Sequence, residues 1–224
     1  MQINCSMNNG FVIAASKKSK FYTSAILLAE SILDYYPEAK ITLFTEAKLF
    51  NENDRSLFDR VFLNAPHHER AKLWALPQTP YDKTCYVDAD CECVHEDITN
   101  IFDLLDDCDI ALTKIREYAG AQVHFNNGKD KLEWHCGVFL YDRTMIKFME
   151  DWWYHYQRQK TDHVNYPDTP ISIKDWDQYT FWYLLKKQEY KSIKIKEIDP
   201  RWNFVHIYNE DETKQEKVLV HHTI

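Results

Sequence analysis

The chain has 224 residues, a mass of 26.9 kDa and a formal net charge of −8. This length is typical of one domain with a sizeable core, and the acidic balance disfavours general nucleic-acid binding. Only 4 residues are glycine, and Gly10, Gly120, Gly128 and Gly137 are too scattered for a phosphate-binding glycine loop. The composition therefore excludes a P-loop and a dinucleotide-binding fingerprint.

The start of the chain has neither the basic residues nor the apolar core of a signal peptide. No apolar run approaches the ~20 residues that span a bilayer. The 6 cysteines contain no C-x-x-C pair, and Cys91 and Cys93 are too close for a usual zinc pair. We therefore expect a cytoplasmic protein with reduced, free thiols.

A β-α-β unit is predicted at the beginning of the chain. Residues 11–15 form a short apolar run typical of a buried strand, and apolar residues from Phe21 to Tyr36 recur at helical spacing. Pro37 ends this helix, because the residue before a proline avoids the α region. Residues 41–45 predict the second strand.

Strands and helices continue to alternate along the rest of the chain. Further strands are predicted at residues 61–63, 84–87, 110–113, 138–141, 193–195 (an edge strand) and 218–220. Helices are predicted at residues 54–58, 98–105, 145–156 and 176–187, with polar loops at 116–133, 167–170 and 209–217. The alternation favours an α/β fold in which residues 1–224 form one domain, with a mostly parallel, Rossmann-like sheet covered by helices on both faces. Such sheets bind ligands at the carboxyl ends of their strands.

Two carboxylates follow the strand at 84–87 directly. Asp88 and Asp90 are separated only by Ala89. An extended chain would point their side chains to opposite sides, but a turn at this point can bring them together. Paired carboxylates suit Mg²⁺ or Mn²⁺, and either ion can bridge a diphosphate. A bound ion would then balance the charge of the phosphates, so that no glycine loop is needed. The alternative is that both residues only cap the following turn and helix.

The residues around this pair resemble the central block of the family 8 glycosyltransferases. The similar segment covers residues 72–76 and 79–90 and ends with Asp88-Ala89-Asp90. Four more blocks resemble the family in the same order along the chain. These are residues 136–140 (CGVFL), 177–178 (DQ), 201–204 (RWNF) and 220–221 (VH), so that the resemblance spans most of residues 11–222.

The resemblance implies a GT-A fold, a nucleotide-diphosphate sugar as donor (a UDP-sugar) and Mn²⁺, with Mg²⁺ as the alternative ion. It also implies transfer with retention of configuration. Asp88, Asp90 and His221 would be the metal ligands, and a neutral imidazole beside two carboxylates suits Mn²⁺. His222 is the rival ligand, because strand alternation places it on the opposite face. The remaining alternative is that both histidines simply lie at an exposed end of the chain.

The resemblance also assigns a donor site. Lys72 matches a basic residue that holds the phosphates or the sugar, Arg70 is the substitute, and a solvated Lys72 on a helix surface is the alternative. Phe21 or Tyr22 stacks on the base unless these rings pack in the core. The expected donor-binding residues are Ala14, Ala15, Ser16, Phe21, Lys72, Asp88, Ala89, Asp90, His135 and Gly137.

Asp177 and Gln178 are the expected catalytic residues. By the resemblance they lie near the anomeric carbon, where Gln178 positions or stabilises the sugar and Asp177 orients its hydroxyls. Were the enzyme inverting, a carboxylate base would be needed, and Asp177 or Glu133 would serve. Alternatively, Asp175 and Asp177 cap the helix that begins near Trp176.

The sequence departs from the family pattern at three places. Residues 16–19 (SKKS) replace an acidic and a tyrosine residue that contact the base, and His135 stands where the family has asparagine. The glycine and Lys-Pro-Trp segment that follows the family histidine is not in this sequence. One phosphate contact is therefore lost or replaced, or the sequence is truncated.

Three other protein classes share some of these features. A haloacid-dehalogenase-type phosphatase also has D-x-D after a strand, with the first Asp as nucleophile, but that motif normally lies near the N-terminus. A sugar-nucleotide pyrophosphorylase needs a glycine-rich loop after the first strand. A non-catalytic sugar or sugar-nucleotide binding module would fit the altered base site and the aromatic residues Trp152, Trp153 and Trp202, which otherwise pack in the core. The acceptor stays open among a glycan, a lipid-linked sugar, a protein and a modified base.

Overall fold

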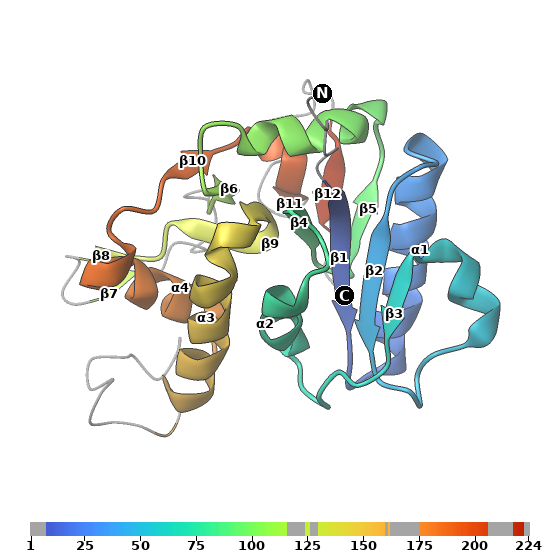
Figure 1. Cartoon of the computed structure of the whole chain (residues 1–224), viewed down its shortest axis with the longest axis horizontal. Helices are drawn as coiled ribbons and strands as arrows, with labels where there is room; N and C mark the ends of the chain where they lie inside the picture. The colour runs from blue at the N-terminus through green and yellow to red at the C-terminus, as the bar shows by residue number, and fades with distance from the viewer. Residues whose placement is uncertain are drawn as a thin grey trace, which may run out of the picture.

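The computed structural model describes residues 8–115, 124–125, 130–159, 161, 175–205 and 217–221. One seven-stranded sheet, ordered β10-β6-β9-β4-β1-β2-β3, runs through the centre of the molecule (Figure 1). Its strands are β1 (Asn9–Ala15), β2 (Ile41–Thr45), β3 (Arg60–Phe62), β4 (Lys83–Val87), β6 (Ile110–Lys114), β9 (Trp134–Asp142) and β10 (Ile195–Glu197). Each overlaps a strand that the sequence predicts. The edge strand β10 shares only Ile195 with its predicted range, 193–195.

The sheet is mostly parallel, as predicted. Strand β1 pairs in parallel with β2 and β4, β2 with β3, and β6 with β10. The exception is β9, which is antiparallel to both β4 and β6. No helix is predicted between the strands that became β6 and β9, and antiparallel neighbours need no helical crossover. The long β9 extends the predicted strand 138–141 to Trp134, which brings His135 and Gly137 into the sheet.

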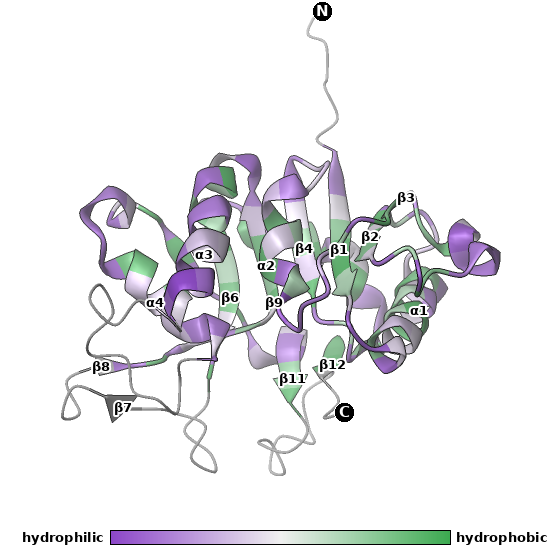
Figure 2. Cartoon of the chain, turned by 90° about the horizontal axis from the view of Figure 1, so that it is seen from below, coloured by the Kyte–Doolittle hydropathy of each residue, from purple (hydrophilic) through white to green (hydrophobic). Residues whose placement is uncertain are grey.

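Helices cover both faces of the sheet, and successive residues of β1 show how the two cores form. Phe11 and Ile13 pack with α1 (Ser19–Tyr35) on one side, whereas Val12 packs on the other side with residues of α2 (Ala71–Ala75), α3 (Ile146–Gln159) and α4 (Asp177–Lys186). Figure 1 shows α2, α3 and α4 grouped together, apart from α1. Figure 2 shows hydrophobic residues concentrated in strands such as β1 and hydrophilic residues on the outer helices.

The remaining helical segments are short or of the 3-10 type. They are η1 (Glu52–Leu57), η2 (Leu76–Gln78), η3 (Glu96–Leu105), η5 (Arg143–Met145), η7 (Gln188–Tyr190) and η8 (Pro200–Asn203). The predicted helices at 54–58 and 98–105 are therefore 3-10 helices, η1 and η3. In η3 the predicted apolar residues, from Ile98 to Leu105, are buried against the core.

A smaller sheet, ordered β11-β12-β5, is the main feature that the sequence analysis missed. It contains β5 (Cys91–Cys93), β11 (Phe204–Val205) and β12 (Leu219–His221). Strand β12 was predicted at 218–220, but β5 and β11 are too short to show a pattern. The antiparallel pairing of β12 with β5 sets His221 opposite Cys91, so the end of the chain returns to the Asp88-Ala89-Asp90 turn.

Several loop predictions fall partly or wholly outside the described residues. In the stretch 116–133, β7 (His124–Phe125) and β8 (Asp130–Lys131) pair in a two-stranded sheet, which corrects the prediction of a loop there. The stretches 167–170 and 209–216 lie outside the described residues. Within the described part of the chain, no helix is both long and apolar enough to cross a membrane. The described cysteines, Cys85, Cys91, Cys93, Cys108 and Cys136, are unpaired, as predicted.

Candidate functional site

A pocket of about 100 Å³ opens at the carboxyl ends of β1 and β4. The chain leaves β1 for β2 on one side and later places β4 on the other, and ligands of α/β sheets bind at such a switch in strand order. The pocket is lined by Ala14, Ser16, Phe21, Glu69, Arg70, Ala71, Lys72, Tyr86, Asp88, Ala89 and Asp90. Seven of the ten predicted donor-binding residues are in this set. Ala15 is not, because its side chain packs in the core.

Lys72 is buried at the centre of this site. Its ammonium lies 2.9 Å from Asp177 Oδ2 and 3.2 Å from Asp88 Oδ1, and it donates a hydrogen bond to the Cys136 carbonyl at 3.0 Å. Burial lowers the pKa of Lys72, but the carboxylates of Asp177 and Asp88 outweigh burial and raise the pKa above its usual value. Lys72 is therefore a permanent cation. The alternative of a solvated lysine on a helix surface is wrong, since the residue is 7% exposed.

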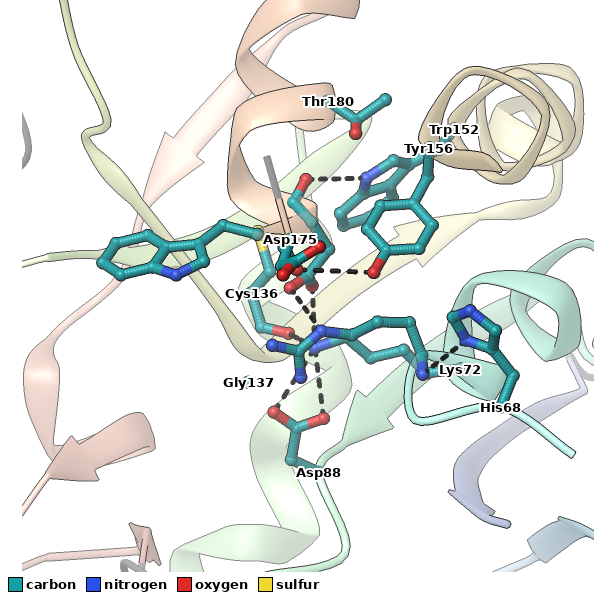
Figure 3. Close-up of polar contacts among 12 residues, drawn as sticks. His68, Lys72, Asp88, Cys136, Gly137, Trp152, Tyr156, Asp175 and Thr180 are labelled. Atoms are coloured by element: carbon teal, nitrogen blue, oxygen red, sulfur yellow. Dashed lines mark hydrogen bonds and ion pairs between the residues drawn. The ribbon is translucent and has the colours of Figure 1, made fainter. Parts of the chain in front are cut away.

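Asp177 lies between two cations. It is the first residue of α4 and is 2% exposed, and the Arg70 guanidinium Nε lies 3.4 Å from its Oδ1. Attraction to Asp177 raises the pKa of Arg70, so this side chain also stays charged. Lys72 and Arg70, its predicted substitute, thus both form ion pairs with the Asp177 carboxylate. Figure 3 shows Lys72 reaching from α2 toward Asp88.

The helix-capping alternative for Asp177 does not hold. The N-cap residue of α4 is Trp176, and its side chain makes no capping hydrogen bond. The Asp177 carboxylate instead pairs with the buried Lys72 and with Arg70, while its backbone carbonyl accepts a hydrogen bond from Trp152 Nε1 at 3.0 Å. Trp152 is fully buried, so it belongs to the core and not to a sugar-binding surface.

Asp88 is oriented by two neighbouring strands. The Tyr86 hydroxyl donates to Asp88 Oδ1 at 2.6 Å, and the Asp88 amide donates to the Gly137 carbonyl on β9 at 2.7 Å. Burial, followed by the Asp88 charge, raises the pKa of Tyr86, so its phenol stays protonated and donates. Sequence reasoning missed Tyr86. Strand alternation could have found it, because residues two apart in a strand share a face.

His135 and Gly137 on β9 are linked to the pocket by Asp88, which lies next to Gly137. A Cβ added to Gly137 would lie 3.2 Å from Asp88 Oδ2 and 2.8 Å from His135 Cε1. The Gly137 amide donates to His135 Nδ1 at 3.3 Å, and Asn203 Nδ2 lies 2.7 Å from the same nitrogen. A backbone N–H can only donate, so Nδ1 is the acceptor and the ring proton is on Nε2. The Asn203 amide also donates to Thr113 Oγ1 at 3.1 Å, which holds this arrangement in place.

The predicted metal ligands are only partly described. Asp88 and Asp90 both line the pocket, and the register of β12 sets the backbone of His221 opposite Cys91, one residue beyond Asp90. The side chain of His221 and the whole of His222 lie outside what the structure describes. Among the described side chains, no group of three His, Cys, Asp or Glu residues is placed to hold a metal ion. Two hard carboxylate ligands on the pocket wall nevertheless fit Mn²⁺ or Mg²⁺.

Gln178 and Glu133 do not line the pocket. Gln178 is half-buried and follows Asp177 as the second residue of α4. Glu133 is part-exposed, and its carboxylate pairs with Lys131 at 3.1 Å. Gln178 is therefore next in the chain to Asp177 of the buried ion pair. The Glu133 carboxylate is instead paired with Lys131.

Glu46 holds the loop that follows β1, and sequence reasoning missed it. Its carboxylate accepts hydrogen bonds from Ser16 Oγ at 2.9 Å and from the Lys17 amide at 2.6 Å, and His67 Nδ1 lies at 3.0 Å. Burial raises the pKa of Glu46, but the donors, with Lys48 first, outweigh burial and lower the pKa to about 2. Lys17 has a φ of 72°, a left-handed conformation that the Glu46 bond helps to hold. Glu46 could have been found from its position directly after β2, because the carboxyl end of β2 lies at the same edge of the sheet as that of β1.

Comparison with known proteins identifies the fold. No family model and no curated protein sequence matches the chain. The glycosyltransferase GlyE of Streptococcus pneumoniae TIGR4 is similar with a TM-score of 0.64 and 14% identity, over 96% of this chain and 55% of GlyE. The galactosyltransferase LgtC, solved with donor and acceptor sugar analogues, gives 0.57 and 15%, over 96% of this chain and 87% of LgtC. The bifunctional glycosyltransferase WbbM gives 0.63 and 13%, over 100% of this chain and 47% of WbbM.

The chain therefore has the α/β fold of these glycosyltransferases, as the resemblance to family 8 implied. It spans about half the length of GlyE and of WbbM.

Proposed function

We propose that the chain is a metal-dependent glycosyltransferase that moves a sugar from a nucleotide-diphosphate donor, a UDP-sugar, to an acceptor with retention of configuration. The observation that carries the proposal is the pocket at the strand-order switch, where Asp88 and Asp90 lie beside the buried Lys72. The shared fold supports the same class of reaction, because LgtC, GlyE and WbbM are glycosyltransferases.

Asp88 and Asp90, with His221 as third ligand, would hold Mn²⁺, and Mg²⁺ is the alternative. When bound, the ion supplies positive charge that stabilises the leaving diphosphate. Tyr86 and the Gly137 carbonyl hold Asp88 from two sides, so this carboxylate is oriented before an ion arrives.

The Lys72 and Asp177 pair would hold the donor sugar. Asp177 is 2% exposed and is not among the residues that line the pocket, so it would orient the sugar hydroxyls through Lys72 and Arg70, which line the pocket and pair with its carboxylate. Gln178 lies next in the chain and would position the anomeric centre. In LgtC, an active-site mutant that replaces a glutamine by glutamate has been solved, which supports a functional glutamine in this fold.

The nucleotide base would lie against Ala14, Ser16 and Phe21, which line the pocket at the end of β1 and the start of α1. The Phe21 ring is part-exposed, with the ammonium groups of Lys18 and Lys20 at 5.4 and 5.5 Å from its centre, and would stack on the base. Tyr22 is buried, and its hydroxyl donates to Asp54. Glu46 keeps the Ser16–Lys17 peptide in place. The unpaired thiols of the described region support a reducing compartment, which we take to be the cytoplasm.

The proposal is tested with a panel of nucleotide-sugars, with and without Mn²⁺, by thermal shift and by slow donor hydrolysis. One donor is expected to raise the melting temperature only when Mn²⁺ is present, and Asp90→Ala is expected to abolish both the shift and hydrolysis. Asp103→Ala is the matched control, because Asp103 is an exposed aspartate on η3 outside the pocket. Calorimetric titration with Mn²⁺ alone measures the ion site independently of activity.

Two results would replace the proposal by another function. Binding of sugars without any metal dependence or turnover indicates a non-catalytic module. Release of phosphate from phosphomonoesters, abolished by Asp88→Asn, indicates a phosphatase with Asp88 as nucleophile.

A further inference from the structure

Two aromatic rings near the end of α4 each have a lysine over the ring. The Lys186 ammonium lies 5.3 Å from the ring centre of Trp182, and the Lys187 ammonium lies 5.4 Å from that of Tyr183. All four side chains are exposed or part-exposed. Because residues four apart share one side of a helix, the apolar stem of each lysine lies along its ring. The end of α4 thus combines apolar ring surface with positive charge.

Helix α3 contributes the same combination beside α4. The Tyr154 ring is 50% exposed, and the guanidinium carbon of Arg158 lies 5.1 Å from its centre. His155 joins the two helices, because its ring centre lies 5.5 Å from that of Tyr183 and its Nε2 accepts a hydrogen bond from Lys187 at 2.7 Å. Figures 1 and 2 show α3 and α4 side by side. The three cation–aromatic pairs therefore form one surface, which we call the α3–α4 face.

The α3–α4 face is positive although the whole chain is acidic. Residues 146–159 and 178–197 contain seven lysine and arginine residues and four carboxylates, whereas the chain has a net charge of −8. One of these carboxylates, Asp151, is already paired with Lys147 and accepts a hydrogen bond from Tyr190. Lys191, which follows the end of α4, is exposed. A positive surface on an acidic molecule orients that molecule toward an anionic partner.

This face is separate from the donor pocket. Asp177, the first residue of α4, belongs to the buried ion pair, whereas Lys186 is the last residue of the same helix. At 1.5 Å per residue, the two ends are roughly 14 Å apart along the helix. The three cation–aromatic pairs all belong to the described helices, and none of their residues lines the pocket. A partner bound to the α3–α4 face therefore need not cover the pocket.

An anionic lipid bilayer is the partner that this combination of side chains fits. Tryptophan and tyrosine rings are favoured at a membrane–water interface, because the ring is apolar and its edge carries a polar group. Lysine and arginine beside them are attracted to anionic headgroups while their stems stay against the rings. A single-stranded nucleic acid also binds rings and cations, but it stacks its bases on open ring faces. In the α3–α4 face a cation already lies over each ring.

We infer that the α3–α4 face binds the surface of anionic phospholipid bilayers. Lys186, Lys191 and Arg158 contact the headgroup phosphates, and the rings of Trp182 and Tyr154 lie at the level of the headgroups. Binding is reversible and weakens with salt, because the attraction is chiefly electrostatic. The inference does not rest on the proposed sugar transfer, since no residue of this face has a role in that reaction.

The test is co-sedimentation of the full chain with vesicles of phosphatidylcholine alone and of phosphatidylcholine mixed with phosphatidylglycerol. The chain is expected to bind only the vesicles that contain phosphatidylglycerol, and about 0.5 M NaCl is expected to release it. Lys186→Gln combined with Lys191→Gln should weaken binding roughly tenfold or more. Lys40→Gln combined with Arg60→Gln is the matched control, because both residues are exposed, lie at the starts of β2 and β3, and change the net charge equally. The melting temperatures of both double variants should match the wild type, which shows that they fold.

Two results would overturn the inference: no binding to phosphatidylglycerol vesicles, or an equal loss of binding in the two double variants. Binding of a fluorescent oligodeoxythymidine that depends on Lys186 and Lys191, without binding to vesicles, would show a nucleic-acid site instead. The donor reaction is measured separately by the Mn²⁺-dependent thermal shift with nucleotide-sugars, which the Lys186 and Lys191 substitutions should leave unchanged. A missing donor shift in the wild type, with normal vesicle binding, would refute the proposed transfer reaction alone.

Discussion

Lys72 on α2 and Asp177 at the start of α4 form a buried ion pair with 2.9 Å between Nζ and Oδ2. Both residues are under 10% exposed, at 7% and 2%, and Asp88 and Arg70 contact the pair from either side. Charges removed from water in this way are costly unless each has a partner. The pair therefore couples the stability of the fold to the integrity of the site.

Replacing Lys72 by methionine should destabilise the protein strongly. Asp177 would keep only Arg70 as a partner, and removing one member of a buried pair costs about 3–5 kcal/mol. We expect Lys72→Met to fall near the lower end of that range in urea unfolding. Lys72→Arg, which keeps the charge, is the control and should lose less stability. A loss below about 1 kcal/mol in Lys72→Met would show that the pair is not a stabilising contact.

Glu46 should make the fold sensitive to acid. Its pKa is about 2 in the folded protein against an ordinary value of 4.5. The stabilisation is complete above about pH 4.5 and is lost as the pH falls toward about 2, because the unfolded state binds the proton first. Glu46→Gln should therefore lower the unfolding free energy by about 1–3 kcal/mol at neutral pH and show a smaller further loss on acidification. Glu38→Gln, an exposed glutamate, should behave like the wild type. Parallel pH profiles of wild type and Glu46→Gln would contradict this account.

Gly137→Ala should impair the site more than the fold. A Cβ at this position would lie 2.8 Å from His135 Cε1 and 3.2 Å from Asp88 Oδ2, so both side chains must move. We expect a stability loss of about 1–3 kcal/mol from overpacking. We also expect at least a tenfold weaker donor-dependent thermal response, measured as the donor concentration at half-shift. Unchanged donor binding in a folded Gly137→Ala protein would mean that Asp88 need not keep its observed position.

His135 should carry its proton on Nε2 at neutral pH. The Gly137 amide donates to Nδ1, and Asn203 Nδ2 lies 2.7 Å from that nitrogen. Two-bond ¹H–¹⁵N correlations of the imidazole report the tautomer directly. Asn203→Ala removes one of the donors and should increase exchange between tautomers, while Lys194→Ala at an exposed position should not. Detection of Nδ1–H as the dominant form in the wild type would refute the assignment.

Much of the fold was predictable because its signals are local. Strand β1 and helix α1 follow from apolar spacing within a few residues of each other, and β2 was predicted with its observed bounds. The pocket position was predictable too, since Asp88 directly follows a buried strand and the carboxyl ends of parallel strands meet at one edge. The short strands β5 and β11 and the antiparallel direction of β9 have no such local signal, because strand direction depends on which neighbours pair.

By itself, then, the amino-acid sequence determined the alternation of strands and helices, the Asp88-Ala89-Asp90 turn and the candidate residues of the pocket. The tertiary structure alone decided that Lys72 is buried against Asp177, that Glu46 holds the loop after β1, and that His135 is fixed by Gly137 and Asn203. The physical reason is that the periodic pattern of apolar side chains depends only on residues that are close together in the sequence. The partner of a buried charge is instead set by packing between segments that are far apart in sequence.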